Sequence, residues 1–158
     1  MFIVDAHEDI AYNALEWGRD IRLSAYTVRS KEAAEAKANG KERTSNIAMS
    51  GLPELRRGGF GMVFGVIFAH PLLKGMSKEQ CHTQCYRNVE EAYRVGQGQL
   101  DYYRELAEEP GVVLVQQQSD LQELIMAWEN SREDDEERPF GIVPLMEGAD
   151  PIRTPDEA

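Results

Sequence analysis

Two residues at the end of the first apolar run have side chains that could bind a metal ion. This run is FIVDAHED, residues 2–9. In a β-strand, residues two apart share a face, so His7 and Asp9 are expected to point the same way. One imidazole and one carboxylate in this arrangement could ligate a divalent cation. The alternative is that the two residues only end a strand and begin a loop.

A third candidate ligand ends the last apolar segment. Residues 140–148, FGIVPLMEG, are typical of a strand that closes on Glu147. The carboxyl ends of parallel strands lie at one edge of a sheet, so we expect Glu147 near His7 and Asp9. A carboxylate placed there can bridge two metal ions, as two-metal hydrolases require. Asp5 has the strand parity of His7 and Asp9, and it could support the ligands or be a buried capping acid.

The remaining histidines and the two cysteines are weaker candidates. His70 follows the second apolar strand and could reach a site there, although a loop histidine is the simpler interpretation. Cys81 and Cys85 are four apart in a helical pattern, which favours two buried thiols on one face. A metal site with His82 is conceivable, but His82 lies on another face. Two cysteines are too few for a disulfide framework, which favours a cytoplasmic protein.

Strands and helices are predicted to alternate along the chain. Gly, Pro and capping residues mark the boundaries. The predicted strands are 2–9, 59–69, 112–115 and 140–148. The predicted helices are 10–17, 52–57, from a capping box at 77–80 to about 109, and 121–128. Irregular structure is expected at 19–28, a solvated helix or loop at 29–43, and a charged loop at 132–138.

This alternation predicts an α/β fold with parallel strands. Residues 59–69 are apolar on both faces, which is typical of a strand covered on both sides. Pro144 is awkward in a central strand and suggests a bulge or an edge position. Thr154 and Glu157 form a capping box that would begin a further helix.

Composition excludes several function classes. The 158 residues fit one domain, with 42% hydrophobic residues and a net charge of −11. This charge argues against nucleic-acid binding through phosphates and against binding an anionic membrane surface. No apolar stretch approaches the roughly 20 residues that span a bilayer, and the N-terminus lacks the features of a signal peptide.

Three sequence blocks together resemble the membrane (renal) dipeptidase family of zinc peptidases, in the amidohydrolase superfamily. The first is DAHED, residues 5–9, which is similar to the family's opening Asp-x-His-x-Asp. The second is residues 52–64, which contain LRRGGFG and resemble the segment leading into the second barrel strand. The third is LMEGAD, residues 145–150, which resembles the Glu-Gly motif of the third strand. The blocks follow the family's order and span nearly the whole chain.

The resemblance implies a partial TIM (β/α)₈ barrel, roughly its first three βα units, as a single incomplete domain over 1–158. It implies two zinc ions in the complete fold, with His7 and Asp9 on one and Glu147 bridging both, and fewer or none in this chain. Zinc-activated water would then attack a dipeptide or a similar small amide. The family's later histidine ligands and its catalytic and substrate-binding residues are not matched, so we expect an N-terminal piece that is inactive alone.

Two other functions remain open from the sequence. The chain could be a metal hydrolase that acts on another amide or an ester. It could also be a non-catalytic α/β unit that forms a homo-oligomer, because an incomplete barrel leaves apolar edges exposed.

Overall fold

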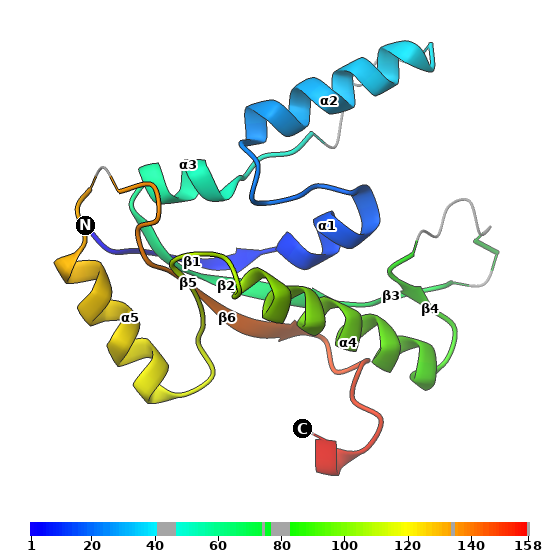
Figure 1. Ribbon diagram of the computed structural model, residues 1–158. Helices are drawn as coiled ribbons and strands as arrows, with labels where there is room; N and C mark the ends of the chain where they lie inside the picture. Colours follow the sequence, from blue (N-terminus) through cyan, green and yellow to red (C-terminus); the bar gives the residue numbers. More distant parts are fainter. Residues whose placement is uncertain (41–46, 74, 77–82, 134, 158) are drawn as a thin grey trace.

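Four parallel strands form the central sheet of the protein. The computed structural model describes residues 1–40, 47–73, 75–76, 83–133 and 135–157. The strands lie in the order β1-β2-β6-β5 (Figure 1), with the bounds β1 Ile3–Glu8, β2 Phe60–Phe68, β6 Phe140–Glu147 and β5 Val112–Leu114. The predicted α/β class and the parallel strands are therefore confirmed. A closed barrel stays a prediction.

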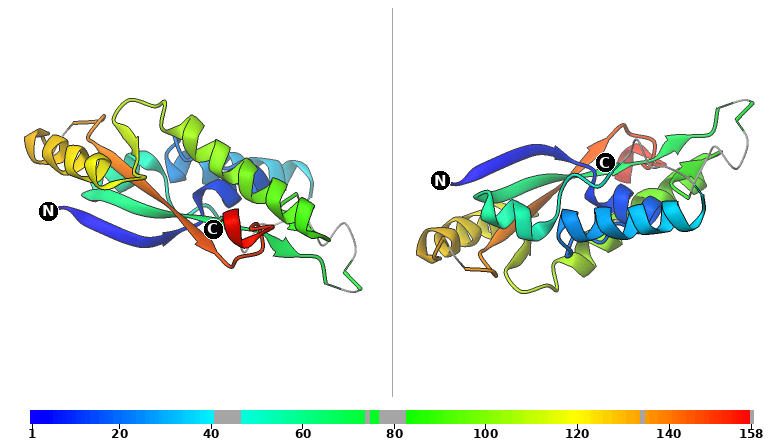
Figure 2. Two further views of the ribbon diagram at one scale, coloured as in Figure 1. Left: turned by 90° about the horizontal axis from the view of Figure 1, so that it is seen from below. Right: turned by 90° about the horizontal axis from the view of Figure 1, so that it is seen from above.

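Helices connect the strands and cover the sheet. They are α1 Ile10–Trp17, α2 Ala25–Ala38, α3 Leu52–Arg57, α4 Val89–Leu106 and α5 Gln118–Asn130, and a 3₁₀ helix, η1, spans Pro155–Glu157. Both views in Figure 2 show α1, α2 and α4 on the same side of the sheet. A separate two-stranded pair, β3 His70–Pro71 and β4 Cys85–Tyr86, lies beyond the end of β2.

Alternate residues of β2 enter two different cores. Val63 and Ile67 belong to the larger core, where residues of α1, α3 and α4 pack. Met62 belongs to a smaller core with Leu124 of α5, against which Phe64 also packs. Because successive strand residues point to opposite faces, β2 is covered on both sides, as its sequence predicts.

Pro144 lies where β6 has lost one neighbour. β5 pairs with β6 only at residues 140–142, whereas β2 stays paired with β6 as far as Glu147. At Pro144 the strand is thus paired on one side only among the described residues, and a missing N–H is tolerated at such an edge. This agrees with the edge position that its sequence suggests.

The predicted start of the long helix is wrong. α4 begins at Val89, and the side chain of Asn88 caps it by accepting a hydrogen bond from the Glu91 N–H at 2.9 Å. Glu91 in turn accepts a hydrogen bond from the Arg87 N–H at 2.8 Å. These bonds stabilise a helix start at Asn88, and the earlier capping box at 77–80 lies outside the described residues.

Cys85 is not a buried helical thiol. It lies in β4, paired with His70, and it is disulfide-bonded. Cys81, the other cysteine of the sequence, and His82 lie outside the described residues. The cysteines therefore no longer support a reducing compartment, and the cytoplasmic location stays a prediction.

Irregular structure is predicted over residues 19–28, but the last four of these residues form the start of helix α2. α2 begins at Ala25, where the Ser24 hydroxyl accepts a hydrogen bond from the Tyr26 N–H at 3.2 Å. A serine at this position satisfies a backbone donor of the first turn and so stabilises the earlier start. The charged, Ala-rich part of the segment is confirmed as a largely exposed helix as far as Ala38.

Candidate metal centre

The three predicted ligands come together at one edge of the sheet. His7 lies near the end of β1, Asp9 follows that strand, and Glu147 is the last residue of β6. One donor atom from each lies within 4.8 Å of the other two. The His7 imidazole Nε2 is 3.8 Å from Asp9 Oδ1 and 3.6 Å from Glu147 Oε2. Residues 140 positions apart in the sequence thus meet because their strands are parallel.

These distances suit a divalent cation. Two ligands about 2.1 Å from a tetrahedral zinc ion lie roughly 3.4 Å apart, close to the separations of the His7 nitrogen from the two carboxylate oxygens. The imidazole and the carboxylates are also ligand types that zinc accepts. About half of each side chain is exposed, at 51% for His7, 46% for Asp9 and 51% for Glu147, so solvent ions can reach the donors.

A bulge in β1 changes how His7 is presented. Asp5 pairs with Val63 and Glu8 with Gly65, so β1 takes three steps where β2 takes two. The extra residue breaks the alternation that predicted a shared face for Asp5 and His7. The Asp5 carboxylate instead accepts a hydrogen bond from the His7 N–H at 3.0 Å. Asp5 therefore supports the backbone of a ligand, which is one of its two predicted roles.

Asp9 is the N-cap residue of α1, but its carboxylate does not cap the helix. An aspartate at this position ordinarily accepts a hydrogen bond from the first turn. Here the Asp9 side chain makes no such bond, so its oxygens stay available to an ion. The backbone carbonyl of Asp9 is held instead, because it accepts hydrogen bonds from the Asn13 N–H at 3.0 Å and from Asn13 Nδ2 at 2.8 Å.

A buried tyrosine joins this helix start to the sheet. The Tyr103 hydroxyl donates to the Val66 carbonyl at 2.8 Å and accepts from the Ala11 N–H at 3.3 Å. Tyr103 is fully buried, and its ring lies against Gly65, where an added Cβ would come within 2.8 Å of it. The first turn of α1, and with it Asp9, is thereby fixed relative to β2. The sequence predicts a helix over this residue, but nothing in its pattern indicates this bond.

Glu8 lies between two of the ligands in sequence but is not part of their cluster. Its carboxylate accepts a hydrogen bond from the Ser50 hydroxyl at 3.2 Å. Burial raises the pKa of the Glu8 carboxyl above its usual range, although the Ser50 bond opposes this, and the nearby Asp5 and Asp9 charges raise it further.

A small cavity of about 190 Å³ lies beside the ligands, and His7 and Asp9 are part of its lining. Arg19, also in the lining, forms a 2.7 Å ion pair with Glu32 of α2, and both side chains are nearly buried. The Arg19 guanidinium also donates to Asn13 Oδ1 at 2.6 Å. This pair holds α2 near the site. Its members lie in segments that the sequence predicts to be irregular and solvated, so no sequence signal indicated it.

His70 is not part of the cluster. Its Nδ1 lies 3.0 Å from the Pro71 carbonyl oxygen, and its ring packs edge-on against Phe68. His70 is therefore no ligand of this cluster, but it is not a loop histidine either, because it lies in β3 and pairs with Cys85 of β4. Within the described ranges, His7, Asp9 and Glu147 are the one group of three or more such side chains that could hold an ion.

Comparisons with known proteins found no similar protein. No family model matches the sequence, no curated protein matches it, and no solved structure matches it. None of the helices in the described ranges is long and apolar enough to cross a membrane.

Proposed function

We propose that the protein is a zinc-dependent hydrolase of small amides, with a dipeptide as its substrate. The observation that carries the proposal is the convergence of His7, Asp9 and Glu147 at the ends of two strands that flank β2. The substrate class and the second zinc ion are inferred from the three sequence blocks that resemble zinc dipeptidases. The (β/α)₈ barrel is part of the same proposal, and the order β1-β2-β6 agrees with three successive barrel strands.

The three side chains have distinct roles in this proposal. His7 and Asp9 would hold one ion, and Glu147, which has two carboxylate oxygens, would bridge that ion and a second. A zinc ion bound here polarises a carbonyl group and lowers the pKa of a coordinated water, which is the chemistry that amide hydrolysis needs. Asp5 and Tyr103 fix the backbone around the ligands through the hydrogen bonds described above.

Zinc titration tests the metal centre directly. We expect the protein to bind zinc in competition with a chromogenic chelator, and His7→Ala to weaken binding by at least about 100-fold, because even residues that only support a ligand contribute 10–100-fold. His70→Ala is the matched control and should bind zinc like the unmodified protein. Equal binding by the two variants, or no binding by the unmodified protein, would contradict the proposal.

Hydrolysis tests the substrate, and it is measured on the zinc-loaded protein joined to the later barrel strands that the resemblance implies, because the chain alone is expected to be inactive. A panel of dipeptides is compared with lactones and cyclic amides, and cleavage should be fastest for dipeptides and absent in Glu147→Gln. Cleavage of a lactone or cyclic amide alone would support the second substrate class. An exposed carboxylate far from the site, such as Glu129, provides the control variant Glu129→Gln.

A non-catalytic, self-associating protein is the second candidate. Val4 of β1 and Met146 of β6 are 43% and 41% exposed, and β1 is paired on one side only among the described residues. Exposed apolar side chains beside an open strand edge favour pairing with another chain. Light scattering distinguishes the candidates, because a stable monomer of 17.9 kDa would contradict self-association.

A further inference from the structure

A second, larger cavity lies away from the metal ligands, beside α4 and the β3–β4 pair. Its volume is about 600 Å³, within the range of small-molecule sites. Leu15, Leu72 and Val95 give it an apolar lining. Gly98 is also in the lining, and a Cβ added there would meet nothing within 4 Å. Apolar side chains and open space provide room for a hydrocarbon group.

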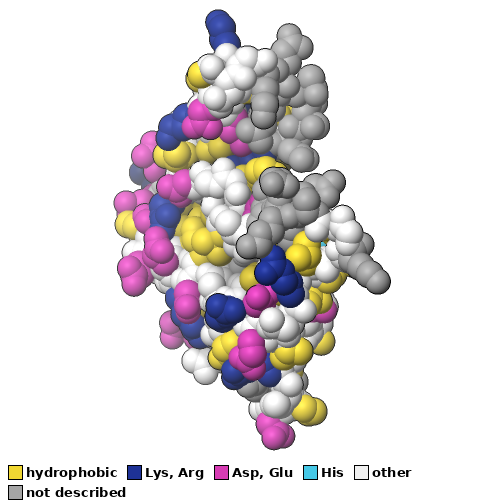
Figure 3. All heavy atoms as spheres, turned by 90° about the vertical axis from the view of Figure 1, so that its right-hand side faces the viewer, with side chains coloured by type: hydrophobic (Ala, Val, Ile, Leu, Met, Phe, Trp, Pro, Cys, Tyr) yellow, Lys and Arg dark blue, Asp and Glu magenta, His cyan; other side chains and the backbone are white. Residues whose placement is uncertain are grey.

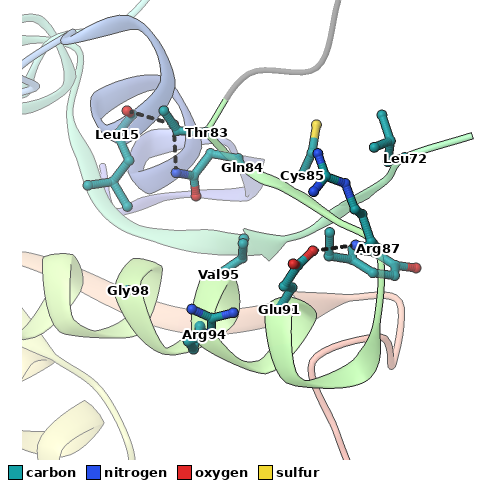
Figure 4. A pocket seen from close by; sticks show the side chains of 11 residues that line it. Leu15, Leu72, Thr83, Gln84, Cys85, Arg87, Glu91, Arg94, Val95 and Gly98 are labelled. Atoms are coloured by element: carbon teal, nitrogen blue, oxygen red, sulfur yellow. Dashed lines mark hydrogen bonds between the residues drawn. The ribbon is translucent and has the colours of Figure 1, made fainter. Parts of the chain in front are cut away.

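Two guanidinium groups border the same cavity. Arg87 precedes α4 and Arg94 lies one and a half turns into it. Figure 4 shows the Arg87 side chain ending beside Cys85 and Arg94 on the helix beside Val95, with Glu91 between them. Figure 3 views the molecule from the side of the β3–β4 pair, where basic, acidic and hydrophobic side chains are mixed.

The pairing of the arginines distinguishes these two from most others. Among the described residues, ion pairs to described carboxylates are recorded for five arginines: Arg19, Arg22, Arg57, Arg104 and Arg153. Neither Arg87 nor Arg94 is ion-paired with a carboxylate in the part of the chain that the structure describes. The Arg94 Nε–H donates only to the Glu90 carbonyl at 3.3 Å. In a chain with a net charge of −11, two unpaired guanidinium groups at one cavity are unexpected.

The charge balance of the lining favours an anion. Arg87 and Arg94 contribute two positive charges and Glu91 one negative charge, which leaves one net positive charge. The Glu91 carboxylate is also engaged, because one of its oxygens accepts the Arg87 N–H at 2.8 Å. Guanidinium groups bind carboxylates through charge-assisted hydrogen bonds.

We propose that this cavity binds a small carboxylate with an apolar body, attracted by the positive charges of Arg87 and Arg94 and packed against the apolar lining of Leu15, Leu72 and Val95. Gln84 is buried in the wall of the cavity, and its side-chain oxygen Oε1 accepts a hydrogen bond from Gln99 Nε2 at 2.9 Å, which fixes this wall. The site is independent of the proposed hydrolase function, since none of the three metal ligands lines it.

Binding of hexanoate, followed by amide NMR shifts, tests the proposal. We expect shifts at Gln84, Val95 and Gly98 that saturate. Affinity should fall about tenfold or more with hexanamide, which lacks the charge, and with acetate, which lacks the apolar body. Equal affinity for hexanoate and hexanamide, or shifts located elsewhere, would overturn it.

Variants of the arginines provide the second arm. Arg87→Gln/Arg94→Gln should weaken hexanoate binding by about tenfold or more, since the lining then loses both positive charges that favour an anion. Arg104→Gln, on the same helix but paired with Asp101, is the matched control and should bind like the unmodified protein. A dispersed NMR spectrum shows that each variant is folded. Unchanged binding in the folded double variant would overturn the assignment.

Discussion

The metal centre and the arginine cavity are built on different kinds of support. The donors of the metal centre lie near or just beyond the ends of β1 and β6. Both strands pair with β2, a nine-residue strand that lies between them. Of the arginines at the cavity, Arg87 lies between β4 and α4, and Arg94 lies in the second turn of α4, next to a pair of two-residue strands. The first site is therefore fixed by the central sheet, and the second by the contact between α4 and a short peripheral segment.

This difference has a consequence for how each site responds to change. Long parallel pairing is cooperative and spreads a local perturbation over many backbone bonds, whereas a two-residue pair depends on a few side chains. We therefore expect the metal centre to respond to changes between the sheet and α1, and the cavity to changes between α4 and β4. Two side chains of α4, Gln99 and Tyr103, separate these effects.

The largest effect is expected at Gln99, which joins α4 to both β2 and β4. Its buried amide accepts from the Phe68 N–H at 2.8 Å and donates to the Phe68 carbonyl at 2.6 Å and to Gln84 Oε1 at 2.9 Å. Gln99→Leu leaves the partly buried N–H and carbonyl of Phe68 and the buried Gln84 amide oxygen without these partners, so the free energy of unfolding should fall by about 2–5 kcal/mol. Urea unfolding measures this change.

The same variant can break the comparison. If the two regions are supported separately, Gln99→Leu should weaken hexanoate binding at the cavity and leave zinc affinity within about threefold of the unmodified protein. A loss of zinc affinity as large as the loss of hexanoate binding would show that the two sites respond as one unit.

The reverse pattern is expected for Tyr103. Tyr103→Phe keeps the ring against Gly65 but removes the hydroxyl that bonds to Val66 and Ala11. Its free energy of unfolding should fall by about 1–3 kcal/mol, because two buried backbone groups lose a partner. Zinc affinity should fall with it, since Ala11 lies in the helix turn that begins at Asp9, and hexanoate binding should not.

A matched tyrosine controls for removal of the hydroxyl alone. Tyr26 of α2 is 67% exposed, and Tyr26→Phe should change neither stability nor zinc affinity. Retention of full zinc affinity in Tyr103→Phe at zinc concentrations near the dissociation constant would show that Tyr103 supports the fold but does not position Asp9.

The sequence reveals the first region far better than the second. The apolar runs that end at Asp9 and Glu147 predict strands. Because parallel strands end at the same edge of a sheet, the ligands of the metal centre can be named from the sequence alone. Nothing comparable marks the cavity. Its shape depends on β4, a two-residue strand inside a segment with helical periodicity, where local pattern and tertiary pairing disagree.

Two further details of the structure, a backbone bulge and a buried ion pair, cannot be predicted from the sequence. The bulge in β1 adds one residue between Asp5 and Glu8, and strand parity assumes that no such residue exists. Arg19 and Glu32 read as charged residues of solvated segments, yet they form a nearly buried ion pair. Pairing makes this burial tolerable, and partners so far apart in the sequence are not visible from composition.

The smallest effect is expected at Glu8. It measures how much stability the folded protein loses by burying a negative charge beside the metal ligands. Burial raises the pKa of the Glu8 carboxyl in the folded protein above 4.5, its ordinary value. The folded state therefore holds the proton more tightly, and stability is lost as the pH rises from the ordinary pKa through the raised one.

Glu8→Gln, which keeps a partner for the Ser50 hydroxyl, should raise the melting temperature at pH 7 in the presence of a chelator. The gain should vanish below about pH 4.5, where Glu8 is neutral in both states. The exposed Glu129→Gln should show no such pH-dependent gain, and a gain for Glu8→Gln that persists at pH 4 would mean that shape and not charge limits stability at this edge of the sheet.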